Sequence, residues 1–159
     1  MAKKVDEISL TLSEMARLAA VPETTIVNWR TRGHIDLEAD VDREGRKWRR
    51  YTIFDVLRMA VTGELVNCCV PISRAWDISE EMIIARTRHL ASFKNTPIKA
   101  VVAKFLTQIA IITKDDRGEY QSELMPRRLY DINQLSQRPS HIFIDLGYIA
   151  ESALGLLDL

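Results

Sequence analysis

The side chains best suited to chemistry in this 159-residue chain are short polar groups and cations between residues 24 and 51. One set falls in a segment with helical spacing: Thr24, Thr25, Asn28, Arg30 and Arg32. A second set forms a basic run that ends in an aromatic residue: Arg46, Lys47, Arg49, Arg50 and Tyr51. Short polar groups on a helix can reach base edges in a major groove, and cations neutralise phosphates. These ten residues are therefore the candidate DNA-binding residues.

The remaining reactive side chains lack the spacing of a catalytic or metal site. His34, His89 and His141 are scattered, and no G-x-S-x-G, H-E-x-x-H or Walker A sequence occurs. Cys68 and Cys69 are adjacent, but two thiols alone make an incomplete metal site, and free cysteine is usually buried. We therefore expect no enzymatic activity, no cofactor and no bound metal.

Charge and hydropathy set the broad class. The chain has 22 basic and 22 acidic residues, so any nucleic-acid footprint must be a local patch. The first residues lack the apolar core of a signal peptide, and no apolar run approaches the ~20 residues that span a bilayer. We expect a cytoplasmic protein that associates with the nucleoid and not with a membrane.

Two short helices joined by a tight turn should carry the first polar set. Thr11 and Glu14 have the T-x-x-E spacing of a capping box, in which each side chain satisfies a free backbone N–H of the other residue. After a turn at residues 20–22, a second helix should run from about residue 23 to residue 32. Ile26 and Trp29 share one buried face of that helix, which leaves its other faces polar.

A hairpin and two longer helices should follow. Residues 42–45 form a turn signal between an acidic arm, 36–41, and the basic arm, 46–51, so we expect a β-hairpin. Thr52 and Asp55 should cap a third helix. A fourth helix should begin near Pro71, a residue favoured at the first helical position, and run to Phe93.

The second half of the chain is expected to be richer in strands. Residues 94–97 read as a linker, and residues 98–113 are rich in valine, isoleucine and phenylalanine, which predicts strand structure. A turn at 114–119 should lead into a returning strand at 120–125, and residues 141–144 read as a buried strand. Asp145 should then cap a last helix over residues 146–157.

Three segments of the first half resemble the winged helix-turn-helix of the MerR and excisionase types. Residues 10–21 (LTLSEMARLAAV) resemble the first helix and turn, and residues 24–35 (TTIVNWRTRGHI) resemble the recognition helix and its exit. Residues 49–52 (RRYT), followed by Asp55 and Val56, are similar to the signature that closes the wing and opens the next helix. The resemblance covers about residues 8–92.

Several positions depart from the family's pattern. Ala20 replaces the usual turn glycine, Pro22 replaces the serine cap of the recognition helix, and Val27 replaces a frequent arginine. The acidic arm at 36–42 is also unusual. The departures imply a strained turn, a missing side-chain cap and one phosphate contact fewer.

The resemblance implies a winged helix for the first half, and the strand and helix patterns of the second half predict a small α+β part. The expected fold is therefore α+β in two parts. Residues 8–93 would be a winged-helix DNA-binding domain with its following helix, and residues 98–159 an α+β C-terminal domain for dimerisation or partner binding. The second helix would enter the major groove, and the wing cations would contact phosphates or the minor groove. Tyr51 would lie partly in the core and partly against the DNA backbone. We expect a homodimer that regulates transcription from double-stranded DNA, with two recognition helices ~34 Å apart.

Two other functions fit parts of the sequence. Asn28-Trp29 followed by a basic wing also resembles small terminase subunits of tailed phages, which points to a phage-type DNA-handling protein for packaging or excision. The balanced charge also allows a protein-interaction module that has lost DNA binding. A ring in solution would favour packaging, and an absence of salt-sensitive DNA binding would favour the interaction module. The target site, the sign of regulation, a small-molecule effector and the role of residues 98–159 are not indicated.

Overall fold

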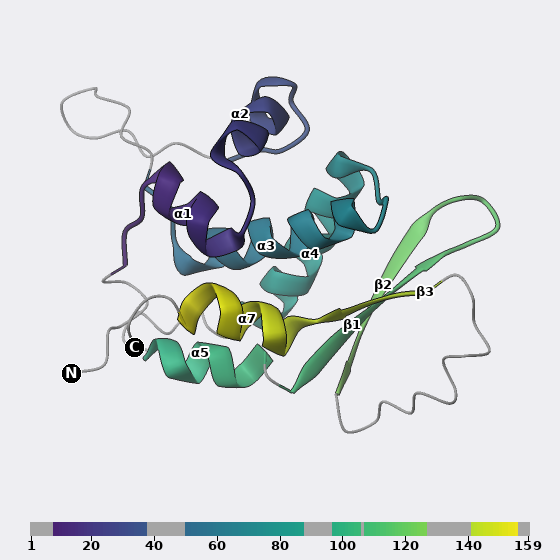
Figure 1. The fold of residues 1–159 in the computed structure, drawn as a ribbon. Coiled ribbons are helices and arrows are strands. Elements are labelled where there is room, and N and C mark those ends of the chain that lie inside the picture. The colour runs from purple at the N-terminus through teal and green to yellow at the C-terminus, as the bar shows by residue number, and fades with distance from the viewer. Residues whose placement is uncertain (1–7, 38–49, 88–96, 106, 127–140, 156–159) are drawn as a thin grey trace.

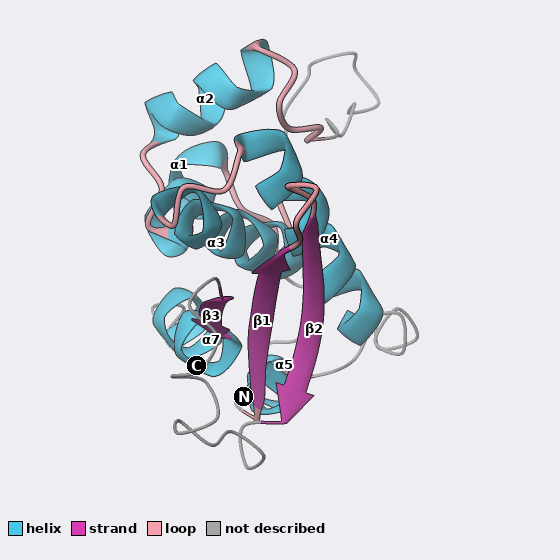
Figure 2. Ribbon diagram, turned by 90° about the vertical axis from the view of Figure 1, so that its right-hand side faces the viewer, coloured by secondary structure: helices cyan, strands magenta, loops and turns pink. Residues whose placement is uncertain are grey.

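The computed structural model describes residues 8–37, 50–87, 97–105, 107–126 and 141–155. The fold is α+β. Helices α1 to α4 lie on one side of the molecule, and a small antiparallel sheet with helices α5 and α7 lies on the other (Figure 1). Figure 2 shows α3 crossing near the ends of strands β1 and β2, with α4 alongside them. None of the helices in these ranges is long and apolar enough to cross a membrane.

The first two helices begin and end close to the predicted residues. Helix α1 spans Leu12–Ala19, and its predicted capping box is confirmed because Thr11 and Glu14 exchange side-chain and backbone hydrogen bonds. Helix α2 spans Glu23–Thr31 and begins after Pro22, which supplies no side-chain cap. The helix therefore relies on its packing and its C-terminal turn, since one N-terminal stabilising contact is missing.

Helix α3 is the centre of the helical side. It spans Ile53–Asn67 and begins at the predicted Thr52–Asp55 capping box. It packs against α1, against α4 (Ile72–Thr87) and against α7 (Leu146–Leu154). A helix enclosed on several sides must be apolar on several faces, as its eight buried residues show. The part of the predicted fourth helix from residue 88 to Phe93 lies outside the described residues.

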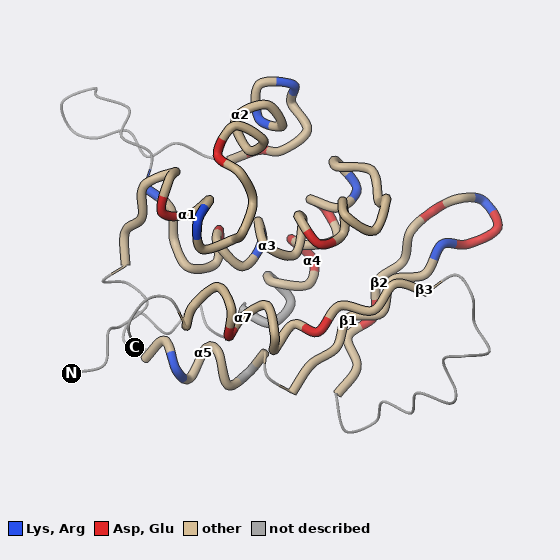
Figure 3. Tube along the Cα trace, viewed as in Figure 1, with Lys and Arg blue, Asp and Glu red and all other residues tan. Residues whose placement is uncertain are grey.

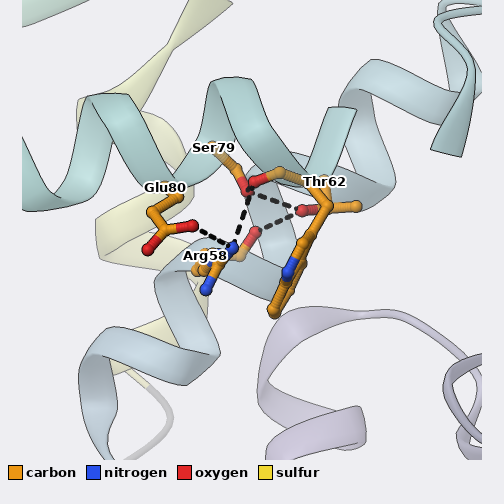
Figure 4. Close-up of polar contacts among 5 residues, drawn as sticks. Arg58, Thr62, Ser79 and Glu80 are labelled. Carbon is orange, nitrogen blue, oxygen red and sulfur yellow. Dashed lines mark hydrogen bonds and ion pairs between the residues drawn. The ribbon is translucent and has the colours of Figure 1, made fainter. Parts of the chain in front are cut away.

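A polar contact fixes how α3 and α4 cross (Figure 4). Arg58 of α3 lies 3.5 Å above the Trp76 ring and donates to Glu80 of α4 at 2.7 Å. Next to it, the buried Thr62 and Ser79 hydroxyls hydrogen-bond at 2.9 Å. Burial lowers the pKa of the Arg58 guanidinium, and the carboxylate of Glu80 opposes that effect. Each hydroxyl also bonds to a carbonyl of its own helix, Thr62 to Arg58 and Ser79 to Trp76. The contacts between the helices favour one relative rotation of α3 and α4, because only that rotation adds these bonds to the intrahelical ones.

The prediction of strand structure from residue 98 is wrong for the first eight residues of the stretch. Helix α5 spans Ile98–Phe105, and the strand starts only at Gln108. The apolar residue types favour strands, but Ile98, Val101 and Phe105 are spaced three and four apart. All three side chains are buried on one face of the helix, so the spacing and not the residue type decides the structure.

The sheet has the order β2-β1-β3, and both pairings are antiparallel. The predicted turn and strands are present: β1 spans Gln108–Lys114, β2 spans Tyr120–Pro126 and β3 spans His141–Asp145. The expectation that residues 141–144 form a buried strand is wrong for the first three, which are half-buried, and Ile144 alone of the four is buried. Asp115 holds the turn by accepting hydrogen bonds from two backbone N–H groups, at Arg117 and Glu119. Asp145 caps α7 as predicted, with its carboxylate accepting from the backbone N–H of Tyr148.

One cluster of buried apolar side chains extends from Leu10 to Leu154. Its members come from α1, α2, α3, α4, α5, α7 and the sheet. Helix α7 contacts α5, α3, α1 and β1, so it joins the two sides of the molecule. The division into two domains between residues 93 and 98 stays a prediction. A test of it must show whether either part folds without the other, because both contribute side chains to this core.

Candidate nucleic-acid interface

Helix α2 carries most of the first candidate set and is held by few buried side chains. Ile26, with no exposed surface, is the one buried residue of this fully described helix, and Trp29 is half-buried against the core. The exposed positions include Thr24, Asn28 and Arg32, while Thr25 and Arg30 are half-buried. The prediction that Ile26 and Trp29 share the inner face is therefore confirmed, and three of the five candidates lie on the outside.

The turn between α1 and α2 is tight because Ala20 adopts a left-handed conformation, with φ of 54°. Its N–H bonds to the carbonyl of Arg17, and the N–H of Val21 bonds to the carbonyl of Ala16. This pattern is a Schellman motif, which usually has glycine at the left-handed position. The strain expected at Ala20 is thus present, and Val21 is buried under the turn.

The turn can approach α3 closely because residue 63 is a glycine. A Cβ atom built on Gly63 would lie 2.7 Å from the Cγ2 atom of Val21. Carbon atoms do not approach that closely without displacement. Gly63 therefore sets the distance between the α1–α2 turn and α3, and with it the position at which α2 begins.

The end of the basic run pairs with the segment before α1. Leu10 and Tyr51 form an antiparallel bridge with hydrogen bonds of 2.9 Å and 2.8 Å. On the adjoining residues, exposed Arg50 donates to the Ser9 hydroxyl at 2.9 Å. The bridge sets Arg50 at the surface near the start of α1 and directs Tyr51 inward. Ser9 was not singled out in the sequence, because only the pairing across the bridge reveals its role.

Tyr51 is 2% exposed, so its ring belongs to the core. Its hydroxyl has no hydrogen bond of good geometry with any described residue. Burial raises the pKa of Tyr51, and the nearby Arg30 guanidinium acts in the opposite direction. Arg30 of α2 therefore lies near Tyr51 and links α2 to the segment that forms the bridge with Leu10. A direct contact between Tyr51 and DNA stays a prediction.

The other candidate residues of the predicted wing, Arg46, Lys47 and Arg49, lie outside the described residues, as does most of the predicted hairpin. Three described and exposed arginines belong to this part of the chain: Arg17 in the last turn of α1, Arg32 directly after α2, and Arg50 beside the Leu10–Tyr51 bridge. Sequence reasoning missed Arg17, although its place in the last turn of a capped helix makes it an exposed cation. Acidic side chains are interspersed here, at Glu14 and Glu23.

Cys68 and Cys69 are both exposed, so the expectation that they are buried is wrong. Cys69 follows the end of α3 in a left-handed conformation, with φ of 65°, and the next residue, Val70, is buried. Partial burial, Glu64 and Cys69 together raise the pKa of the Cys68 thiol. Within the described residues no group of three or more histidine, cysteine or acidic side chains could hold a metal ion.

A scan against models of known protein families finds no match for this chain, and a search of curated proteins finds no similar sequence.

Proposed function

We propose that this protein binds double-stranded DNA through α2 and the basic segment that ends at Tyr51, and that it acts as a sequence-specific transcriptional regulator of the MerR-like type. The observation that carries the proposal is the exposure of α2. A helix whose outer side presents Thr24 and Asn28 and no large apolar group, with Arg32 directly after its last turn, suits entry into a major groove. The antiparallel bridge between Leu10 and Tyr51 supports a wing at this position.

The two parts of the interface would have different roles. Arg50, with Arg46, Lys47 and Arg49, would supply phosphate contacts and most of the affinity. Asn28 and the threonines of α2 would read base edges and supply selectivity. A homodimer would present two α2 helices to half-sites one helical turn apart, ~34 Å. A dimer in solution, measured by light scattering, is the expected assembly, whereas a ring would favour packaging of phage DNA.

The test compares variants for salt dependence and sequence preference after selecting bound fragments from a random DNA pool. Arg32→Ala and Arg50→Ala should each reduce the slope of log affinity against log salt by about 1 for every phosphate that the variant no longer neutralises, on all sequences. Asn28→Ala should keep the slope and relax preference at one base pair by ~1–3 kcal/mol, the value of a bidentate contact.

Arg117→Ala is the matched control. Arg117 is an exposed arginine at the tip of the β1–β2 hairpin, away from α2 in Figure 3. Its removal changes the net charge as much as Arg32→Ala does, and it should leave the slope unchanged. If Arg117→Ala lowers the slope equally, α2 is not the binding surface. If the unaltered protein shows no salt-sensitive binding to DNA at all, the proposal fails.

A further inference from the structure

A cavity of 260 Å³ lies between the α1–α2 turn, α2 and the C-terminal half of α3. Most of its lining residues are small and apolar, among them Val21, Gly63 and three alanines, but the surface that they expose is about as polar as it is apolar. One side is formed by the half-buried Trp29 of α2. The volume is slightly below that of a typical ligand pocket, about 300–1,000 Å³, so a single aromatic ring with a short side chain is the suitable size.

The charged residue in the lining indicates the charge of the ligand. Among the described residues that line this cavity, Glu64 is the only ionisable one, and its carboxylate forms no ion pair or hydrogen bond with any described residue. A carboxylate in the lining of a cavity that contains no cationic side chain among its described residues favours a positively charged ligand. Thr25 and Asn67 add neutral hydrogen-bonding groups to the lining.

We propose that this cavity binds a small aromatic amine in its ammonium form. The ammonium group pairs with Glu64, and the aromatic ring packs between Trp29 and the apolar wall at Val21. Because its walls belong to both α2 and α3, a bound ligand ties the exposed helix α2 to the central helix of the core. Binding to the cavity does not depend on whether the protein binds DNA.

The test uses three probes of the same size class: 2-phenylethylammonium, the neutral 2-phenylethanol and the anionic phenylacetate. Each is titrated into the full chain while the indole N–H signals are followed by NMR. The Trp29 signal should shift with saturation, and the Trp76 signal, from a ring buried under Arg58, should not. The ammonium probe should bind about fivefold more tightly than the alcohol, because only the ammonium forms the exposed ion pair with Glu64.

Glu64→Gln removes the charge and keeps the shape, and it should make the ammonium and the alcohol bind equally. Glu151→Gln, at an exposed position on α7, is the matched control and should keep the preference. The proposal is overturned if no probe gives saturable shifts at Trp29, if the alcohol or phenylacetate binds as tightly as the ammonium, or if the preference survives in Glu64→Gln.

Discussion

Two side chains occupy backbone positions that glycine would adopt more easily. Ala20 ends α1 and Cys69 ends α3, each with positive φ, whereas α2 ends with glycine at the equivalent position, Gly33. In all three, the N–H of the following residue bonds to the carbonyl five residues earlier. A Cβ atom in the left-handed region costs roughly 1–2 kcal/mol, so the hydrogen-bonded turns and the buried residues after them must offset that cost.

Ala20→Gly should therefore raise the free energy of unfolding by about 1 kcal/mol, because relief of the left-handed strain exceeds the added freedom of the unfolded chain. Chemical denaturation of both proteins measures the difference. Ala103→Gly, at an exposed position of α5, is the control and should lower stability by about 1 kcal/mol through helix propensity. A loss of stability in Ala20→Gly would mean that the turn is not left-handed.

The charge of Glu14 should make the start of α1 sensitive to acid. Hydrogen bonds from the backbone N–H and hydroxyl of Thr11 lower the pKa of Glu14 from its ordinary value of 4.5. A carboxyl whose pKa is lowered on folding stabilises the protein above the unfolded value and loses that contribution as pH falls through the folded value. Denaturation of the wild type and Glu14→Gln across this range should give curves that differ at neutral pH and converge in acid. A constant difference would contradict the assignment.

At the scale of elements, the placement of α2 depends on the contact between Gly63 and Val21. Helix propensity alone predicts that Gly63→Ala stabilises α3 by about 1 kcal/mol. The 2.7 Å approach predicts the opposite, a net loss of about 1–3 kcal/mol, because the added methyl group overpacks the turn. Denaturation of the single variants and of the double variant Gly63→Ala/Val21→Ala forms the test.

In this double-mutant cycle, the double variant should lose less stability than the two single variants lose when their losses are added, since Val21→Ala removes the atom that clashes. Additive effects would show that the two residues do not meet. A gain in stability in Gly63→Ala alone would show that the turn lies farther from α3 than the structure has it.

Elements that begin with a local signal could be predicted from the sequence. The two capping boxes, Asp145 before α7 and the turn at Asp115 rest on residues three or four positions apart, so the sequence contains the whole interaction. Helix α5 was missed because β-favouring residue types conflict with a helical spacing, and burial resolves that conflict only when the partner elements are known. The exposure of the cysteines depends likewise on the chain path after α3.

Site geometry was predictable only in part. The outer face of α2 follows from its periodicity, whereas the proximity of Arg30 to Tyr51 and the bond from Arg50 to Ser9 bring together residues far apart in the sequence. The cavity at Trp29 and Glu64 has the same origin, since α1, α2 and α3 all contribute to it. No local pattern encodes such contacts, because they depend on how the helices pack.

At the scale of the whole molecule, the shared core makes the two halves interdependent. Helix α7 covers part of α3, and α5 lies against α7. A fragment of residues 1–97 would expose buried apolar side chains of α3. We expect it to unfold at a lower temperature than the full chain, with weaker cooperativity, in circular dichroism. A fragment that melts like the full chain would instead support an independent domain at residues 8–93.

The position of α7 also has a consequence for biosynthesis. The helices proposed to contact DNA are made first, yet one wall of their shared core is supplied by a helix made much later. Until that helix leaves the ribosome, the nascent chain presents an uncovered apolar strip along α3, of the kind that chaperones bind. The half that is proposed to bind DNA should therefore reach its final form only after translation has passed residue 154.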